Sequence, residues 1–305
     1  MSTALLKEKI ILPSLELIKN DSKIKKYYFI PGLLSIVLLS VLLVYQSIYT
    51  YIIILGKKKE ALELILNFFH SSYLIEIIVI SVIFMLIYII SMPILEWWLI
   101  KYISDRDVKW SASFWDSVGF GIYRFYPLFE FSNIFNQFKF INILNGYLFA
   151  LRFIGLEYVK YISYLFIVIY LFSIVINTIA SYARYEIVLC DKWVFQAIGA
   201  SSKISLINIR ITMKLYFLMF ILNIKVILNF IIFLSFPILF VLAFSFITSQ
   251  IFLAIALFIL GVIFLGLIII LGYITSVLEI FSTAIWYQAY KIWKRKLIES
   301  ENFKG

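Results

Sequence analysis

Runs of about 20 apolar residues recur along this 305-residue chain, and they constrain its fold more than any other feature. A helix rises about 1.5 Å per residue, so such a run matches a bilayer core of about 30 Å. Hydrophobic residues make up 64% of the chain and charged residues 14%. A soluble domain of this length has too little interior to hide that much apolar surface. The runs are continuous rather than alternating, which predicts helices and not a barrel.

We therefore predict an all-α fold, a polytopic integral membrane helical bundle of about six spans with amphipathic or re-entrant cytoplasmic helices. A single transmembrane domain, residues 30–290, is expected between a basic amphipathic segment at 1–29 and a basic tail at 291–305. The predicted spans are 30–55, 73–100, 138–156, 161–182, 226–247 and 251–273, the last extending towards 290. Polar side chains interrupt 138–156, so a re-entrant segment is the alternative there.

Prolines and one glycine predict where these helices start or bend. Pro13 is expected to break the N-terminal amphipathic helix, and Pro31 to start the first span. Pro93 lies inside the second span, where it should kink or break the helix. The last apolar run is twice as long as the bilayer core, so its helix should protrude, tilt or break near Gly272.

Two charged amphipathic segments, 101–139 and 184–225, lie between the spans. From Trp110 onward, apolar side chains recur at helical spacing and polar ones fall opposite them. This pattern is typical of a helix that lies in the membrane interface. We expect two half-immersed helical elements on the cytoplasmic face.

The basic residues predict the orientation. Twenty-two of the 27 Lys and Arg residues fall on one side of the six-span arrangement. Basic residues concentrate on the cytoplasmic side of membrane proteins, so both termini are expected in the cytoplasm. The five basic residues on the opposite face are Lys57, Lys58, Lys59, Arg152 and Lys160. The expected location is the cytoplasmic membrane of a prokaryote.

All seven tryptophans lie in or beside the same cytoplasmic segments. Amphipathic indole rings prefer the lipid–water interface. The predicted lipid-interface residues are Trp97, Trp98, Trp110, Trp115, Trp193, Trp286 and Trp293.

Ionisable side chains at membrane depth are costly and are therefore candidates for a ligand pathway. The candidates are Arg152, Glu157, Lys160, Glu279, Glu96 and Arg124. Structural explanations compete with this one. Glu96 can reach water from the end of its span, and Glu157 can pair with Lys160 three residues on. Arg124 can pair with Glu130 or meet lipid headgroups.

The sequence argues against most chemistry. Its one cysteine, Cys190, excludes an intrachain disulfide, and its one histidine, His70, excludes a histidine metal cage. Phosphate-binding glycine loops, paired histidines and nucleophile elbows do not occur. We expect no enzyme, cofactor or metal site. The net charge of +10 is spread over four membrane-proximal segments, which favours anionic lipid headgroups over nucleic acid as partners. A homo-oligomer or a larger membrane complex is also compatible.

Four stretches resemble known membrane families. KIKKYYFIPGLLSIVLLSVLL (Lys23–Leu43) resembles the opening of the etoposide-induced-protein-2.4 / CysZ-type family, a basic juxtamembrane helix before a proline-started span. SMPILEWWLIKYISDRD (Ser91–Asp107) is similar to that family's exit from its second span. In the C-terminal half, YARYEIVLCDKWVFQAIGASSKIS (Tyr182–Ser205) resembles the amphipathic element of the glycerophosphoryl diester phosphodiesterase membrane-domain group. FSTAIWYQAYKIW (Phe281–Trp293) resembles that group's closing helix.

The first resemblance implies long helices with partly penetrating helix pairs, which suits 110–156 and 184–225. It also implies uptake of anions, sulfate in the CysZ case. The second implies a membrane part that is not itself catalytic. We therefore predict a multi-pass protein of permease or channel-like type, with small-anion transport. The alternative is a non-transporting membrane scaffold or a subunit of an envelope complex.

Overall fold

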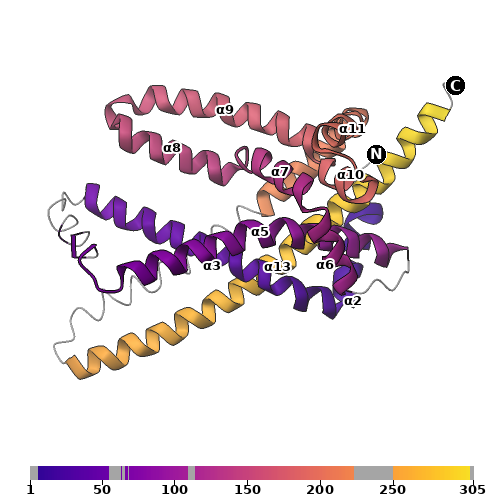
Figure 1. Cartoon of the computed structure of the whole chain (residues 1–305). Helices are drawn as coiled ribbons and strands as arrows, with labels where there is room; N and C mark the ends of the chain where they lie inside the picture. Colours follow the sequence, from indigo (N-terminus) through magenta and orange to yellow (C-terminus); the bar gives the residue numbers. More distant parts are fainter. Residues whose placement is uncertain are drawn as a thin grey trace. The chain divides into compact units, whose positions relative to one another are not determined.

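The computed structural model describes residues 6–54, 63, 66–67, 69–108, 114–222 and 250–302. These residues form helices and no strand, which confirms the predicted all-α class. The elements are a π-helix η1 (Lys7–Ile11), α2 (Leu12–Asn20), α3 (Ser22–Ile54), α5 (Leu74–Asp107), α6 (Phe114–Tyr123), α7 (Phe125–Asn136), α8 (Phe140–Ile154), a 3-10 turn η2 (Leu156–Tyr158), α9 (Val159–Ala180), α10 (Ala183–Cys190), α11 (Val194–Ile207) and α13 (Gln250–Asn302) (Figure 1). A further helix, Ile209–Leu222, follows α11 directly.

Three helical stretches in the described residues are long and apolar enough to cross a membrane, so the chain is an integral membrane protein. They are Leu74–Asp107, Val159–Cys190 and Gly261–Glu299. The pair α11 and Ile209–Leu222 adds a fourth if it forms one span, although the two helices are bent by 103° at their junction. The predicted span 226–247 lies outside the described residues.

Two other predicted spans are helical but differ from expectation. The span at 30–55 falls within α3, which already begins at Ser22, so Pro31 lies inside the helix and not at its start. The basic residues just before the span are therefore part of the same helix. The span at 138–156 corresponds to α8, whose 15 residues extend about 22 Å, less than a bilayer core.

Prolines do not interrupt the long helices. Pro93 lies inside α5, which continues without a break to Asp107. The 53-residue α13 likewise runs unbroken past Gly272. A proline removes one backbone hydrogen bond, which the apolar helix on either side of it tolerates in a membrane protein. Pro13 lies in the first turn of α2, where no hydrogen bond is lost.

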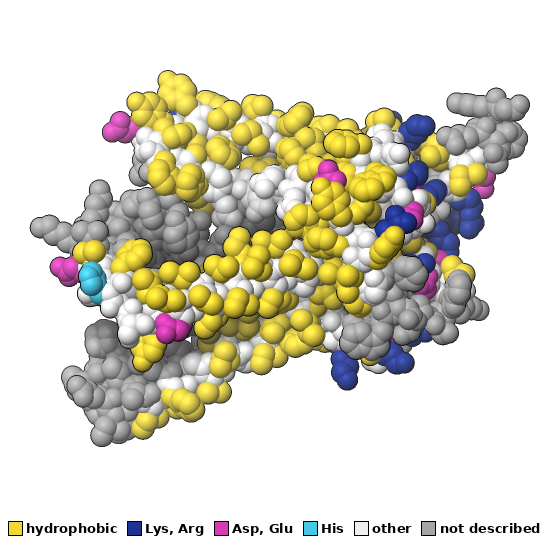
Figure 2. All heavy atoms as spheres, in the orientation of Figure 1, with side chains coloured by type: hydrophobic (Ala, Val, Ile, Leu, Met, Phe, Trp, Pro, Cys, Tyr) yellow, Lys and Arg dark blue, Asp and Glu magenta, His cyan; other side chains and the backbone are white. Residues whose placement is uncertain are grey.

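The chain forms two compact units. Unit 1 comprises Met1–Asp21, Pro93–Asn223 and Ile280–Gly305, and unit 2 comprises Ser22–Met92 and Ile224–Glu279. The division of α5 falls at Pro93. Unit 1 thus contains most of the four segments that carry the basic residues. Lys and Arg side chains gather around α10 and the C-terminal part of α13, whereas the α8–α9 hairpin presents a hydrophobic surface (Figure 2).

Helices α8 and α9 form an antiparallel hairpin in unit 1. Gly155, in the left-handed region at φ 105°, ends α8 and reverses the chain. Tyr147 and Ser163 share a hydrogen bond of 3.0 Å between their hydroxyl oxygens, at the middle of α8. At the open end, the amide of Asn177 donates to the carbonyl of Phe138 at 2.8 Å. These contacts hold α8 beside α9 from its start to its middle.

In unit 2, α3 and α13 approach closely at two glycines. A β-carbon added to Gly32 would lie 1.9 Å from the hydroxyl oxygen of Ser276 and 2.6 Å from the carbonyl oxygen of Gly272. One added to Gly272 would lie 3.2 Å from the α-carbon of Leu33. Small residues allow helix backbones to pack directly in a membrane, where van der Waals contact drives association.

Replacing Gly32 by Ala should therefore destabilise the protein, by about 1–3 kcal/mol, because the methyl group meets α13 backbone that cannot move aside cheaply. The measurement is thermal unfolding of the purified protein in detergent. Gly266→Ala is the control, since no atom lies within 4 Å of its added β-carbon. It should leave the stability unchanged or raise it, and an equal loss in both variants would contradict the close packing.

Candidate functional site

Helix α10 is largely buried, and it lies in the part of unit 1 where the basic side chains gather (Figure 2). Tyr182 and Tyr185 are fully buried beside α13. The Tyr185 hydroxyl donates to the carbonyl oxygen of Thr283 at 2.9 Å, and the Tyr182 ring meets Trp286 edge-on at 5.6 Å. Buried aromatic side chains contribute the most apolar contact area per residue, and their hydroxyl groups need partners. The tyrosines thus fix α10 against α13.

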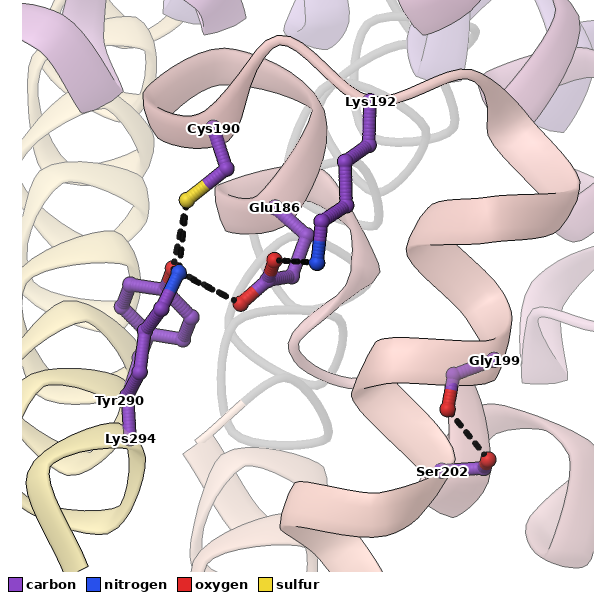
Figure 3. A network of polar contacts seen from close by, with 7 residues as sticks. All are labelled: Glu186, Cys190, Lys192, Gly199, Ser202, Tyr290 and Lys294. Carbon is purple, nitrogen blue, oxygen red and sulfur yellow. Dashed lines mark hydrogen bonds and ion pairs between the residues drawn. The ribbon is translucent and has the colours of Figure 1, made fainter. Parts of the chain in front are cut away.

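A buried carboxylate lies at the centre of this packing. Glu186 is 1% exposed, and its oxygens lie 2.7 Å from Nζ of Lys192 and 2.9 Å from Nζ of Lys294. The Tyr290 hydroxyl donates to the same carboxylate at 2.9 Å. Cys190 lies against the Tyr290 hydroxyl and the Lys294 ammonium (Figure 3). These five residues are called the Glu186 cluster below.

The turn after α10 brings Lys192 into the cluster. Asp191 adopts the left-handed conformation at φ 59°, and the N–H of Lys192 donates to the carbonyl oxygen of Glu186 at 3.4 Å. The N–H of Asp191 returns to the same carbonyl oxygen, and a left-handed residue with such return bonds is a common ending of a helix. It folds the chain back, so the Lys192 side chain reaches the carboxylate of the residue that accepts its N–H. The turn after α10 therefore supplies one cation, Lys192, and α13 supplies the other, Lys294.

Two more acidic groups tie the C-terminal end of α5 into unit 1. Asp107 accepts hydrogen bonds from the Tyr287 hydroxyl, at 3.2 Å, and from Lys291, both on α13. Asp21, which follows α2, accepts from the Tyr102 hydroxyl at 2.7 Å and from Arg106, whose Nη2 lies 2.9 Å away. Carboxylates removed from water need such partners, since an unpaired buried charge is strongly destabilising.

The Glu186 cluster holds charge in place. Its carboxylate lies within ion-pair distance of two ammonium groups and accepts a hydrogen bond from one phenol, so its charge is compensated inside the protein. In the part of the chain that the structure describes, no group of three or more His, Cys, Asp or Glu residues could hold a metal ion. The cluster therefore acts as a clamp between α10 and α13, with basic side chains at its rim.

Within unit 1, the predicted ligand-pathway residues with described side chains form no ion pair with one another. Glu157 and Lys160 are exposed near the hairpin turn, and the structure shows no ion pair between them. Arg152 lies in the last turn of α8, and its side chain is outside the described part. Glu279 belongs to unit 2, where it interacts electrostatically with Tyr88.

Glu96 and Arg124 both find partners that the sequence did not indicate. Glu96 pairs with Arg184 of α10, 2.7 Å away, instead of being solvated alone at the end of its span. Arg124 pairs with Asp191, not with Glu130. Arg124 immediately precedes α7, and Glu130 lies six residues on, which places it on another face of that helix. The αL turn after α10 presents Asp191 to Arg124 instead.

Several tryptophans lie inside unit 1 rather than at its lipid surface. Trp97, Trp98 and Trp293 are 6%, 0% and 1% exposed. The predicted interface at Trp97 assumed that α5 ends there, but α5 continues, and α6 packs on it with Gly121 beside the Trp97 ring. Only Trp193, 57% exposed, has its ring largely accessible among the tryptophans with described side chains. Trp286 packs on Tyr182; Trp110 and the Trp115 side chain lie outside the described part.

The sequence contains two local patterns that belong to the cluster. Tyr287, Tyr290, Lys291 and Lys294 recur at three- and four-residue intervals and so share one face of α13. Glu186 is the only acidic residue between Arg184 and Cys190. The sequence showed both patterns but gave no reason to place them opposite each other, because 104 residues separate Glu186 from Tyr290.

Comparison of the chain with protein families, with characterised proteins and with solved structures found no match in any of the three. The site must therefore be interpreted from its own geometry.

Replacing Glu186 by Gln should destabilise unit 1 by about 1–3 kcal/mol, because it leaves two ammonium groups facing each other across a neutral amide. Partial exposure of both lysines limits the loss. The measurement is the free energy of unfolding in detergent. Asp191→Asn is the matched control: it removes an exposed ion pair and keeps a residue that accepts the left-handed conformation. A control that loses as much stability as Glu186→Gln would show that the clamp is unimportant.

Proposed function

We propose that this chain is a multi-pass protein of the cytoplasmic membrane that binds and organises anionic lipids beneath a basic cytoplasmic face. It acts as a scaffold or as a subunit of an envelope complex, and not as an enzyme. The observation that carries the proposal is the bend between α11 and the helix Ile209–Leu222. There, exposed cations stand next to exposed apolar side chains on the same surface.

The cations at this bend are Lys203, Arg210 and Lys214, all of them exposed. Among the described residues, none of the three has an ion-pair partner. Arg210 and Lys214 are four residues apart and share a helix face. Lys203 precedes the bend by little more than one turn of α11. Free ammonium and guanidinium groups at such a position suit phosphate headgroups, which contribute about 1 kcal/mol per cation near an anionic membrane.

The apolar side chains at the bend complete an interfacial surface. Leu206 and Ile207 are 62% and 51% exposed at the end of α11, and Phe217 is 62% exposed on the next helix. A helix that lies in the interface buries such side chains among the acyl chains while its cations reach the headgroups. The helix Ile209–Leu222 packs alongside α9. The Thr212 hydroxyl lies 3.1 Å from the hydroxyl of Tyr182, just after α9, and the ring centroids of Phe220 and Tyr170 are 6.4 Å apart.

The arrangement of α8, α9 and α10 supports an orientation of the protein in the membrane. The hairpin α8–α9 carries its turn, with Glu157 and Lys160, at the opposite end from α10. If α9 spans the bilayer, α8 is carried with it, since the two remain in contact from the start of α8 to its middle. The basic bend would then face the cytoplasm, which agrees with the orientation predicted from the distribution of basic residues.

The triple variant Lys203→Gln, Arg210→Gln and Lys214→Gln should lower the affinity for phosphatidylglycerol relative to phosphatidylcholine at least tenfold, because three cation–phosphate contacts are lost. The measurement is quenching of tryptophan fluorescence by brominated lipids of each type in reconstituted vesicles. Trp193 is a suitable reporter, since it is exposed immediately before α11.

Lys57→Gln, Lys58→Gln and Lys59→Gln together make the control, with the same change in charge on the predicted opposite face. The preference for phosphatidylglycerol should persist in this control. The same loss in both triple variants would show that net charge, and not the bend, attracts the lipid, and would contradict the proposal.

A second candidate is a permease for small anions. Two observations favour it: the 103° bend, which fits a broken or re-entrant span, and the α8–α9 hairpin. Transporters use such broken helices to bring backbone groups to the ligand at membrane depth. The resemblance to the CysZ-type family points to the same function, with sulfate as the anion.

This candidate predicts uptake of labelled sulfate by vesicles that contain the protein. Arg152→Gln and Glu279→Gln should each reduce the uptake if these residues line the pathway. Lys296→Gln, at an exposed position on α13 that is not a predicted pathway residue, is the control. Absence of uptake above that of empty vesicles would exclude the permease, and uptake unchanged by either variant would exclude these residues from the pathway.

A further inference from the structure

The cation-lined pocket beside the Glu186 cluster is a second feature of unit 1. Its volume is about 340 Å³, and it is bounded by α10 and one face of α13. The lining side chains include Tyr287, Tyr290, Lys291, Lys294 and Arg295. This size falls within the range of small-molecule sites in proteins, about 300–1,000 Å³. We propose that the pocket binds a phosphate monoester or diester group, independently of the lipid surface at the α11 bend.

The pocket is prepared to receive an anion. Lys291, Lys294 and Arg295 stand at three- and four-residue spacing, so their side chains leave α13 on one face. Lys291 is held by Asp107 and Lys294 by Glu186, which fixes the direction of both side chains before any ligand arrives. Cations that are already ordered lose little conformational freedom on binding. An ammonium group has three N–H donors: Lys291 uses them only in part, toward Asp107, whereas Lys294 already contacts Glu186, Cys190 and Tyr290 and contributes its positive charge.

Arg295 gives the site its unpaired charge. It is exposed, and among the described residues no acidic side chain pairs with it. A guanidinium presents a planar fork of donors that matches two phosphate oxygens. Together with the two lysines it would surround one phosphate group on three sides.

The other residues that line the pocket restrict the kind of ligand that fits it. The carboxylate of Glu299 also borders the pocket and opposes a large negative charge. Tyr287 and Tyr290 supply aromatic surface, and two aliphatic side chains complete the wall. A phosphate ester with a small organic group fits this mixture better than a polyphosphate. The chemistry is shared by two sources, a soluble phosphate ester and a phospholipid headgroup.

Binding of two probes to the full-length protein distinguishes these sources. Glycerol 3-phosphate is titrated by calorimetry into the protein in a zwitterionic detergent, and vesicles of phosphatidylglycerol in phosphatidylcholine are tested by flotation. Saturable binding of glycerol 3-phosphate supports a soluble ligand. Binding to vesicles alone, if it depends on Arg295, supports a headgroup. Binding of neither probe, or binding that does not depend on Arg295, overturns the proposal.

Arg295→Gln is the diagnostic variant, because Arg295 makes no ion pair with the described residues and its loss should leave the fold intact. It should weaken binding of the supporting probe about tenfold, the effect of one charge-assisted contact. Lys296→Gln is the control: Lys296 is also exposed on α13, but it stacks over Trp293 at 4.9 Å and does not line the pocket. Equal weakening by both variants would show unspecific attraction and contradict the site.

The two proposals fail separately. Loss of Lys203, Arg210 and Lys214 should reduce vesicle binding and leave the affinity for glycerol 3-phosphate unchanged. Arg295→Gln should not alter the quenching of Trp193 fluorescence by brominated phosphatidylglycerol. These two measurements therefore show whether the pocket proposal is wrong while the lipid-surface proposal holds, or the lipid-surface proposal is wrong while the pocket proposal holds.

Discussion

Pairing of buried charge is the interaction on which unit 1 depends. Glu186 is 1% exposed, and a carboxylate at such a position requires compensating cations. Lys192 comes from the turn that ends α10, and Lys294 comes from α13, so the pairing can form only when these two elements are in contact. The tyrosine packing of α10 on α13 removes water around the carboxylate and makes this requirement stricter. Salt bridges of this kind add little net stability against an apolar alternative, but they specify which helix faces meet.

The same pairing explains how charge is distributed over unit 1. Asp21, Glu96, Asp107 and Glu186 each neutralise basic groups at helix contacts, and these bases are therefore committed to the fold. Among the described residues, Lys203, Arg210 and Lys214 at the α11 bend and Arg295 beside the pocket on α13 are exposed and have no such partner. An excess of positive charge is thus sorted into two populations, one holding helices together and one available to external anions. In the proposed pocket the two populations meet, because Lys291 and Lys294 keep their internal partners beside Arg295, which has none among the described residues.

Sequence reasoning succeeded where one local property decides the structure. Apolar runs predicted the helices of the long spans, and the amphipathic pattern after Trp110 predicted one interfacial helix where the structure has two short ones, α6 and α7. Pro93 was expected to kink or break its helix, and the last helix to protrude, tilt or break near Gly272; neither helix is broken, because the helix on both sides tolerates one lost hydrogen bond or one glycine. The candidate site was harder. Single charges at depth, such as Glu96, were recognisable, but their partners lie about 90 residues away and no periodicity relates them.

The tryptophans share one region of the sequence, but the structure places individual tryptophans differently, some buried and one exposed. Their concentration in the basic segments marks a region rich in short helices, and that region exists as part of unit 1. Within it, however, a large ring serves core packing as well as it serves the lipid interface. Trp98 and Trp293 are enclosed by neighbouring helices, whereas Trp193, at the turn before α11, remains accessible. Since α11 bends by 103° into the next helix, the accessible indole and the unpaired cations belong to the same helix–turn–helix element. That element combines the two properties that a lipid-facing surface requires, exposed aromatic or aliphatic area and charge with no internal partner.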